Sequence, residues 1–137
     1  MISVLSSTGK YILEPSLMDM HHGSLEWLSA TVLWKQEVAF FQKLLDSYVS
    51  KGAAADEKKK ISHFQNVITY YGGELIDTLR KKIKHHEHKL ADMLQELKGS
   101  DKEYYEEHGD LMEELSAFMK TFNAFKSEFF SFIEKKI

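Results

Sequence analysis

The single proline, Pro15, is the feature that most constrains how this 137-residue chain can fold. Proline interrupts a helix interior because it lacks a backbone N–H and its ring clashes with the preceding turn. Since no proline follows Pro15, the rest of the chain is free to form long helices. The sequence therefore predicts an N-terminal arm, residues 1–15, followed by one domain, residues 16–137.

Apolar residues in the first part of that domain are spaced alternately three and four residues apart. This coiled-coil-like spacing puts them on one face of a helix that packs on its neighbours at a shallow angle. Gly52 follows the last of them, and glycine commonly ends a helix because it tolerates a left-handed backbone. The pattern predicts a helix over about 17–50, with a buried face formed by Trp27, Thr31, Trp34, Val38, Phe41, Leu45 and Tyr48.

Two further helices are predicted over about 56–98 and 101–136. Only Gly99 and Ser100 separate them, with Ser100 and Glu103 in the spacing of a capping box, so they must be antiparallel neighbours. The fold class is therefore all-α, an antiparallel up-down-up bundle of three long helices with a short N-terminal arm. The buried faces are predicted as Ile61, Phe64, Ile68, Gly72, Leu75, Leu79, Ile83, His86, Leu90, Met93 and Leu97, and as Tyr104, His108, Leu111, Leu115, Phe118, Phe122, Phe125, Phe129 and Phe132.

The charge pattern supports this antiparallel pairing. Basic residues from Arg80 to Lys89 and acidic residues from Glu103 to Glu114 would face each other across the turn. We interpret the basic run as one half of an interhelical charge match. With a net charge of -3 and a pI near 6.2, the composition predicts neither a nucleic-acid nor a membrane partner, and no apolar stretch reaches membrane-spanning length. We expect a cytoplasmic protein.

Gly72 and Gly73 lie inside the second predicted helix, where glycine is unfavourable by about 1 kcal/mol relative to alanine. Counting residues along the first two helices from the turn near Gly52 places Trp34 at the same height in the bundle as Gly72. Two explanations remain open, a notch that receives the Trp34 indole or a functional hinge.

Seven histidines are present, and two of them, His86 and His108, occupy positions on buried helix faces. A buried imidazole needs a hydrogen-bond partner or a metal ion. The height count brings these two towards the start of the first helix, so His22, Glu26, His86, His108 and Glu113 are the candidate ligands of a zinc or iron site. Satisfied core histidines are the alternative, and we expect no cofactor.

Catalytic motifs are not evident, because the chain has no cysteine, no glycine-rich phosphate loop and no nucleophile elbow. We therefore expect a protein that is not an enzyme. Apolar residues beside the main buried faces exceed what two neighbouring helices can cover. They predict an association surface for a second copy or a partner helix, unless the arm covers them, and its residues are Leu33, Phe40, Leu44, Tyr70, Met112, Met119 and Phe130.

Three strings carry a resemblance to a known family: residues 37–45 (EVAFFQKLL), 63–66 (HFQN) and 83–90 (IKHHEHKL). They resemble a family of small uncharacterised bacterial three-helix proteins. The resemblance implies no activity, but it suggests a hydrogen bond from Glu37 to His63 or Asn66 that fixes helix register, and a patterned His88. The His85-His86-Glu87 string is also partly similar to hemerythrin-like bundles, although Lys89 and Leu90 stand where that family requires a glutamate.

Overall fold

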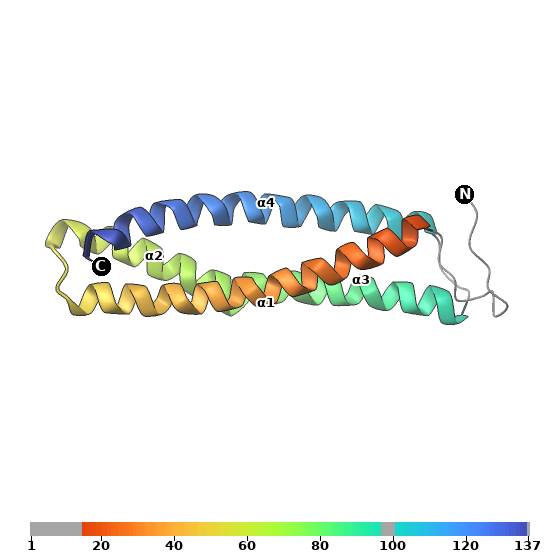
Figure 1. Ribbon diagram of the computed structural model, residues 1–137, viewed down its shortest axis with the longest axis horizontal. Helices are drawn as coiled ribbons and strands as arrows, with labels where there is room; N and C mark the ends of the chain where they lie inside the picture. The colour runs from red at the N-terminus through yellow and green to blue at the C-terminus, as the bar shows by residue number, and fades with distance from the viewer. Residues whose placement is uncertain (1–14, 97–100, 137) are drawn as a thin grey trace.

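The structure, a computed structural model, describes residues 15–96 and 101–136, and Figure 1 shows their helices lying side by side as a long rod. The elements are α1 (Pro15–Ser50), η1 (Ala55–Glu57), α2 (Lys58–Tyr70), η2 (Tyr71–Leu75), α3 (Ile76–Glu96), α4 (Asp101–Ile133) and η3 (Glu134–Lys136). From α2 through η2 to α3 the chain forms one continuous helical element, which runs antiparallel to α1 and α4. The prediction of an all-α bundle of three long helices is confirmed.

Both ends of α1 and the start of the second helical element lie close to the predicted bounds. The predicted end of the second helix at 98, and Leu97 of its predicted buried face, lie outside the described residues. Helix α1 begins at Pro15, two residues before the predicted start, because proline is well tolerated in the first turn, where its missing N–H is not needed. Gly52, with φ of 90°, follows the end of α1 as expected. The arm before Pro15 and the turn at Gly99 and Ser100 lie outside the described residues.

Aromatic side chains of α4 form a large part of the core, together with residues of α1, α2 and α3. All nine residues predicted for its buried face are buried, and six of the seven predicted for α1 are too, Trp27 being half-buried. Phe64 of α2 has no exposed surface and contacts the rings of Phe125, Phe129 and Phe132 at 5.2 to 5.9 Å between centroids. These ring contacts stabilise the half of the bundle where α1 ends.

The second helical element contains a π-helical turn, η2, that the sequence pattern did not reveal. The Ile76 N–H donates to the carbonyl of Tyr71, five residues earlier, so one extra residue is accommodated. The buried face consequently steps from Tyr71 to Ile76, both of which are buried and neither of which was predicted, while the predicted Gly72 and Leu75 are half-buried at its edge. The Lys35 ammonium donates to the Gly72 carbonyl at 2.8 Å and thereby binds a backbone group within this turn.

Gly72 is a packing notch, but for Val38 and not for Trp34. A Cβ added at Gly72 would lie 3.0 Å from Val38 Cγ1, whereas Trp34 packs on Phe118 of α4. The height count was correct to about one helical turn, which is not fine enough to choose between two residues four positions apart. Gly73 faces open space.

This difference predicts opposite outcomes for two neighbouring substitutions. Gly73→Ala is expected to raise the free energy of unfolding by roughly 0.5–1 kcal/mol, because alanine favours helical backbone and meets no neighbour. Gly72→Ala is expected to be about 1–2 kcal/mol less stable than Gly73→Ala, since Val38 must shift. Urea unfolding followed by circular dichroism measures both, and equal effects would contradict the notch.

Candidate functional site

One face of the bundle, between α1 and α4, carries a strip of exposed apolar side chains. An ion pair between Lys126 Nζ and Glu37 Oε2, at 3.1 Å, shows that these two helix faces adjoin. The apolar residues lie on the same faces, because helical neighbours are three, four or seven positions apart. We call this surface the α1/α4 strip, and its members are Leu33, Phe40, Met112, Met119 and Phe130.

The strip is apolar and open. Its five side chains range from 44% exposed at Phe130 to 56% at Leu33 and Phe40. All five belong to the predicted association surface, so their predicted exposure is confirmed. Of the other two predicted members, Leu44 is half-buried against the core, and Tyr70 is exposed but lies on α2, outside the strip.

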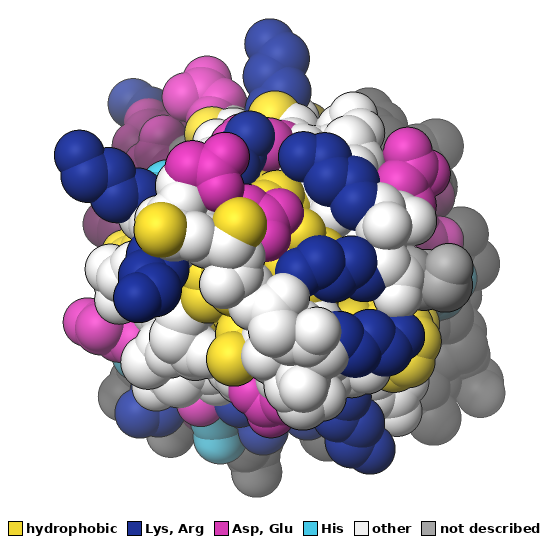
Figure 2. Space-filling view, turned by 90° about the vertical axis from the view of Figure 1, so that its left-hand side faces the viewer, with side chains coloured by type: hydrophobic (Ala, Val, Ile, Leu, Met, Phe, Trp, Pro, Cys, Tyr) yellow, Lys and Arg dark blue, Asp and Glu magenta, His cyan; other side chains and the backbone are white. Residues whose placement is uncertain are grey.

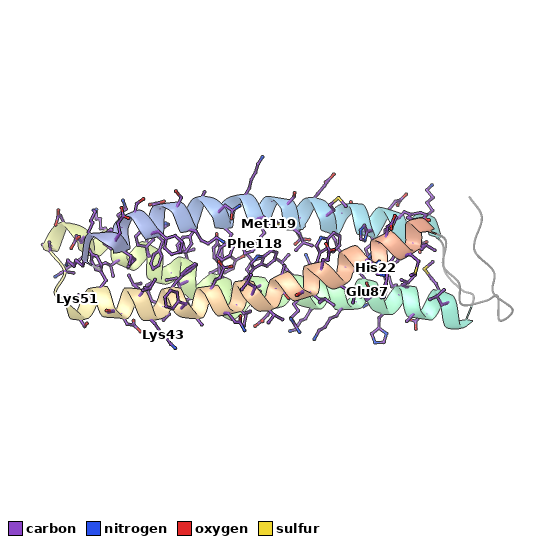
Figure 3. All side chains as sticks on the ribbon, in the orientation of Figure 1. His22, Lys43, Lys51, Glu87, Phe118 and Met119 are labelled. Carbon is purple, nitrogen blue, oxygen red and sulfur yellow. The ribbon has the colours of Figure 1, made fainter. Side chains whose placement is uncertain are left out.

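Charged residues along the borders of the strip change sign from one end to the other. Exposed carboxylates, Asp19, Glu26 and Glu113, lie near the start of α1, and exposed ammonium groups of Lys43 and Lys120 lie farther along. Figure 3 places His22 at the first end and Lys43 and Lys51 towards the second. Figure 2 looks onto this second end of the bundle and shows basic side chains there together with acidic ones.

At the acidic end, two imidazoles are joined inside the bundle. His86 of α3 has no exposed surface, and its Nε2 lies 3.1 Å from Nδ1 of His108 on α4. On the other side of the ring, His86 Nδ1–H donates to Glu107 Oε1 at 2.6 Å, and Lys89 Nζ donates to the second oxygen of the same carboxylate. Glu107, His86 and His108 therefore form one hydrogen-bonded chain from the surface to the interior.

Aromatic rings fix both imidazoles in place. The Tyr104 ring stacks on His86 at 4.1 Å between centroids, and the Trp27 ring stacks on His108 at 4.5 Å. The hydroxyls of Tyr104 and Ser24 are buried, and no hydrogen bond of regular geometry joins either of them to another described residue. Burial, together with the nearby Glu87 carboxylate, raises the pKa of Tyr104, although Ser24 acts weakly in the other direction.

Two members of this hydrogen-bonded chain, Glu107 and His108, have lowered pKa values. Burial, and then the charge of His86, lowers the pKa of His108 to about 4. Burial alone would raise the pKa of Glu107, but the hydrogen bonds from Lys89 and His86 outweigh it and lower that pKa. Glu107 is therefore ionised and His108 neutral at neutral pH.

Of the five predicted metal ligands, the structure brings together only His86 and His108. His22, Glu26 and Glu113 are exposed, and within residues 15–96 and 101–136 no three His, Asp or Glu side chains are arranged to hold a metal ion. His21, adjacent to the predicted His22, is the residue that reaches α3, where its Nδ1 lies 3.0 Å from Glu87 Oε2. Sequence reasoning placed Glu107 only in the acidic run of the charge match and missed it as the partner of His86, because this contact depends on how α3 and α4 are rotated about their axes.

Polar contacts elsewhere confirm one prediction and correct another. The expected charge match appears in the ion pairs Lys82–Glu114 and Lys89–Glu107. The predicted bond from Glu37 to His63 or Asn66 is wrong, because Glu37 pairs with Lys126. Register between α1 and α2 is instead fixed by paired amide hydrogen bonds between Gln42 and Gln65.

The lowered pKa of His108 predicts a stability that falls with acidification. Between pH 6.5 and about 4 the unfolded chain binds a proton at this imidazole and the folded chain does not, so the free energy of unfolding should decrease as the pH falls. The loss is expected to approach about 2–3 kcal/mol at the lower limit. Urea unfolding at pH 7, 5.5 and 4.5 measures it. The free energy of unfolding should decrease less with falling pH in His108→Gln than in the wild-type protein, and as much as in the wild type in the exposed control His88→Gln. An equal decrease in all three proteins would refute the assignment.

No protein-family model, curated protein or solved structure matches this chain. None of the helices in the described part of the chain is long and apolar enough to cross a membrane.

Proposed function

We propose that this chain is a non-enzymatic protein-association module that pairs with a second copy of itself through the α1/α4 strip. The observation that carries the proposal is the gathering of five large apolar side chains, each about half exposed, on one face. Exposed apolar side chains scattered singly are normal, but contiguous ones of this size are characteristic of interaction sites.

The charge pattern favours a second copy over an unrelated partner helix. Helices α1 and α4 run in the same direction, so the strip has one acidic end and one basic end. A twofold axis perpendicular to the rod at the midpoint between Leu33 and Phe40 would place Glu26 of one copy near Lys43 of the other. Such a face is self-complementary, as a twofold interface requires.

The arrangement of the strip also explains why its centre need not be charged. Glu37 and Lys126 neutralise each other across the two helices. The apolar side chains around the midpoint are Leu33, Phe40 and Met119, and the exposed Lys120 lies at the border. Pairing of two copies would remove these apolar groups from water without leaving an unpaired charge.

Light-scattering mass and sedimentation of untagged protein over a range of concentrations test the proposal. The expected result is the mass of two chains, falling towards 15.9 kDa on dilution and dissociating more readily as salt increases, because the end charges are exposed. A single-chain mass at about 1 mM, where even weak pairing with a millimolar Kd would be visible, overturns it.

A further inference from the structure

An open groove lies at the acidic end of the α1/α4 strip, beside the buried histidines. It has a volume of about 400 Å³ and is lined by Asp19, Met20, Gly23, Trp27, His108 and Met112. This lining combines one imidazole, one carboxylate, two thioethers and an indole.

The imidazole in the groove presents a free nitrogen. His108 Nδ1 is occupied by His86, whereas a Cβ added at Gly23 would lie 3.9 Å from His108 Nε2. The absence of a side chain at Gly23 therefore leaves space over this atom. Because the Glu107 carboxylate only accepts, His86 Nδ1 carries a proton; where His86 Nε2 accepts from His108 Nδ1–H, His108 Nε2 is a bare lone pair.

The two thioethers lie on the helix faces that line the groove. Met112 is four residues after His108 on α4, and Met20 is three residues before Gly23 on α1. Thioether sulfur is a soft ligand that prefers Cu(I) over zinc, calcium or magnesium, and imidazole also binds copper. The indole of Trp27, stacked on His108, offers a π-face that attracts a cation.

We propose that this groove binds a soft monovalent metal ion, Cu(I) or Ag(I), through His108 Nε2 and the sulfurs of Met20 and Met112, with Trp27 beside the ion. Glu107 and His86 act as positioning residues, because a hydrogen bond to the second ring nitrogen fixes the orientation of a ligating histidine. The proposal does not depend on self-association. It also differs from the zinc or iron site predicted from sequence, since it uses only His108 of those ligands.

The full-length protein can be titrated with Ag(I), and with Cu(I) kept reduced, in competition with a chromophoric Cu(I) chelator. One equivalent of each ion is expected to bind. Met112→Leu should weaken binding by at least about tenfold, because leucine keeps the volume but lacks the sulfur. Met119→Leu is the matched control: it is also an exposed methionine of α4 on the strip, seven residues away and outside the groove lining, and it should bind as wild type does.

Fluorescence of the Trp34→Phe variant, in which Trp27 is the remaining tryptophan, gives a second measurement. Stoichiometric quenching by Ag(I), lost in Met112→Leu, is expected. The proposal is overturned by no binding at one equivalent, by equal losses in Met112→Leu and Met119→Leu, or by quenching that Met112→Leu does not change. Because the methionine variants leave the buried imidazoles intact, a binding loss is separable from misfolding, which circular dichroism of each variant verifies.

Discussion

The His86→Ala variant is expected to be less stable than the wild-type protein by about 3–5 kcal/mol. The lost ring has no exposed surface and stacks on Tyr104, so its removal leaves a cavity among groups that cannot fully close it. It also removes the partner of His108 Nδ1, which would remain buried without a hydrogen bond.

Two exposed neighbours on the same helix, His85 and His88, provide controls. Their replacement by alanine is expected to change the free energy of unfolding by less than about 0.5 kcal/mol, as is usual for surface positions. Urea unfolding of the three variants at pH 7 measures the difference. If His86→Ala costs no more than His85→Ala, the hydrogen-bonded chain from Glu107 to His108 is not part of the folded structure.

The second large effect concerns association. The double variant Phe40→Glu/Met119→Glu is expected to weaken pairing by at least about 100-fold, roughly 3 kcal/mol, because it places like charges at the centre of an apolar interface. Both side chains are about half exposed in the single chain, at 56% and 46%, so the helical content and the unfolding of the monomer should change little. Sedimentation equilibrium measures the dissociation constant.

Tyr70→Glu is the matched control for this variant. Tyr70 is an aromatic residue as exposed as Met119, but it lies on α2, away from the strip. Its replacement should leave the dissociation constant within about threefold of wild type. If Tyr70→Glu weakens pairing as much as the double variant does, association uses a broader surface than the α1/α4 strip.

Much of the fold could be predicted because its core follows one simple period. The α4 residues from Tyr104 to Phe132 keep the three-and-four spacing without interruption, and all of them are buried. The largest departure lies where the backbone leaves α-helical geometry, although Trp27, Ile61 and Met93, in regular helix, are also only partly buried. Nothing in the residues Tyr71 to Leu75 distinguishes a π-turn from an α-turn by spacing alone, so the burial of Ile76 was missed.

The candidate sites were less predictable, because they depend on which helix faces meet. Sequence periodicity identified His86 and His108 as buried and Met112 and Met119 as surplus apolar residues. It could not show that Met112 and Met20 line one groove, since this follows from the alignment of α1 with α4. Counting residues along the helices predicts the height of a residue to about one helical turn. A hydrogen bond such as that between His86 and Glu107 also depends on how each helix is rotated about its own axis.

Disulfide cross-linking of single-cysteine variants tests the central claim of twofold pairing through the strip most directly. The chain has no cysteine, so one introduced thiol can react only with the same thiol of another copy. Asn123 lies on α4 between Met119 and Lys126, near the centre of the strip, whereas Asp19 lies at its acidic end. The account predicts that, under mild oxidation, Asn123→Cys forms covalent dimers and that Asp19→Cys does not. Cross-linking of Asp19→Cys as readily as Asn123→Cys, or no more cross-linking of Asn123→Cys than of Ser62→Cys on α2, would contradict it.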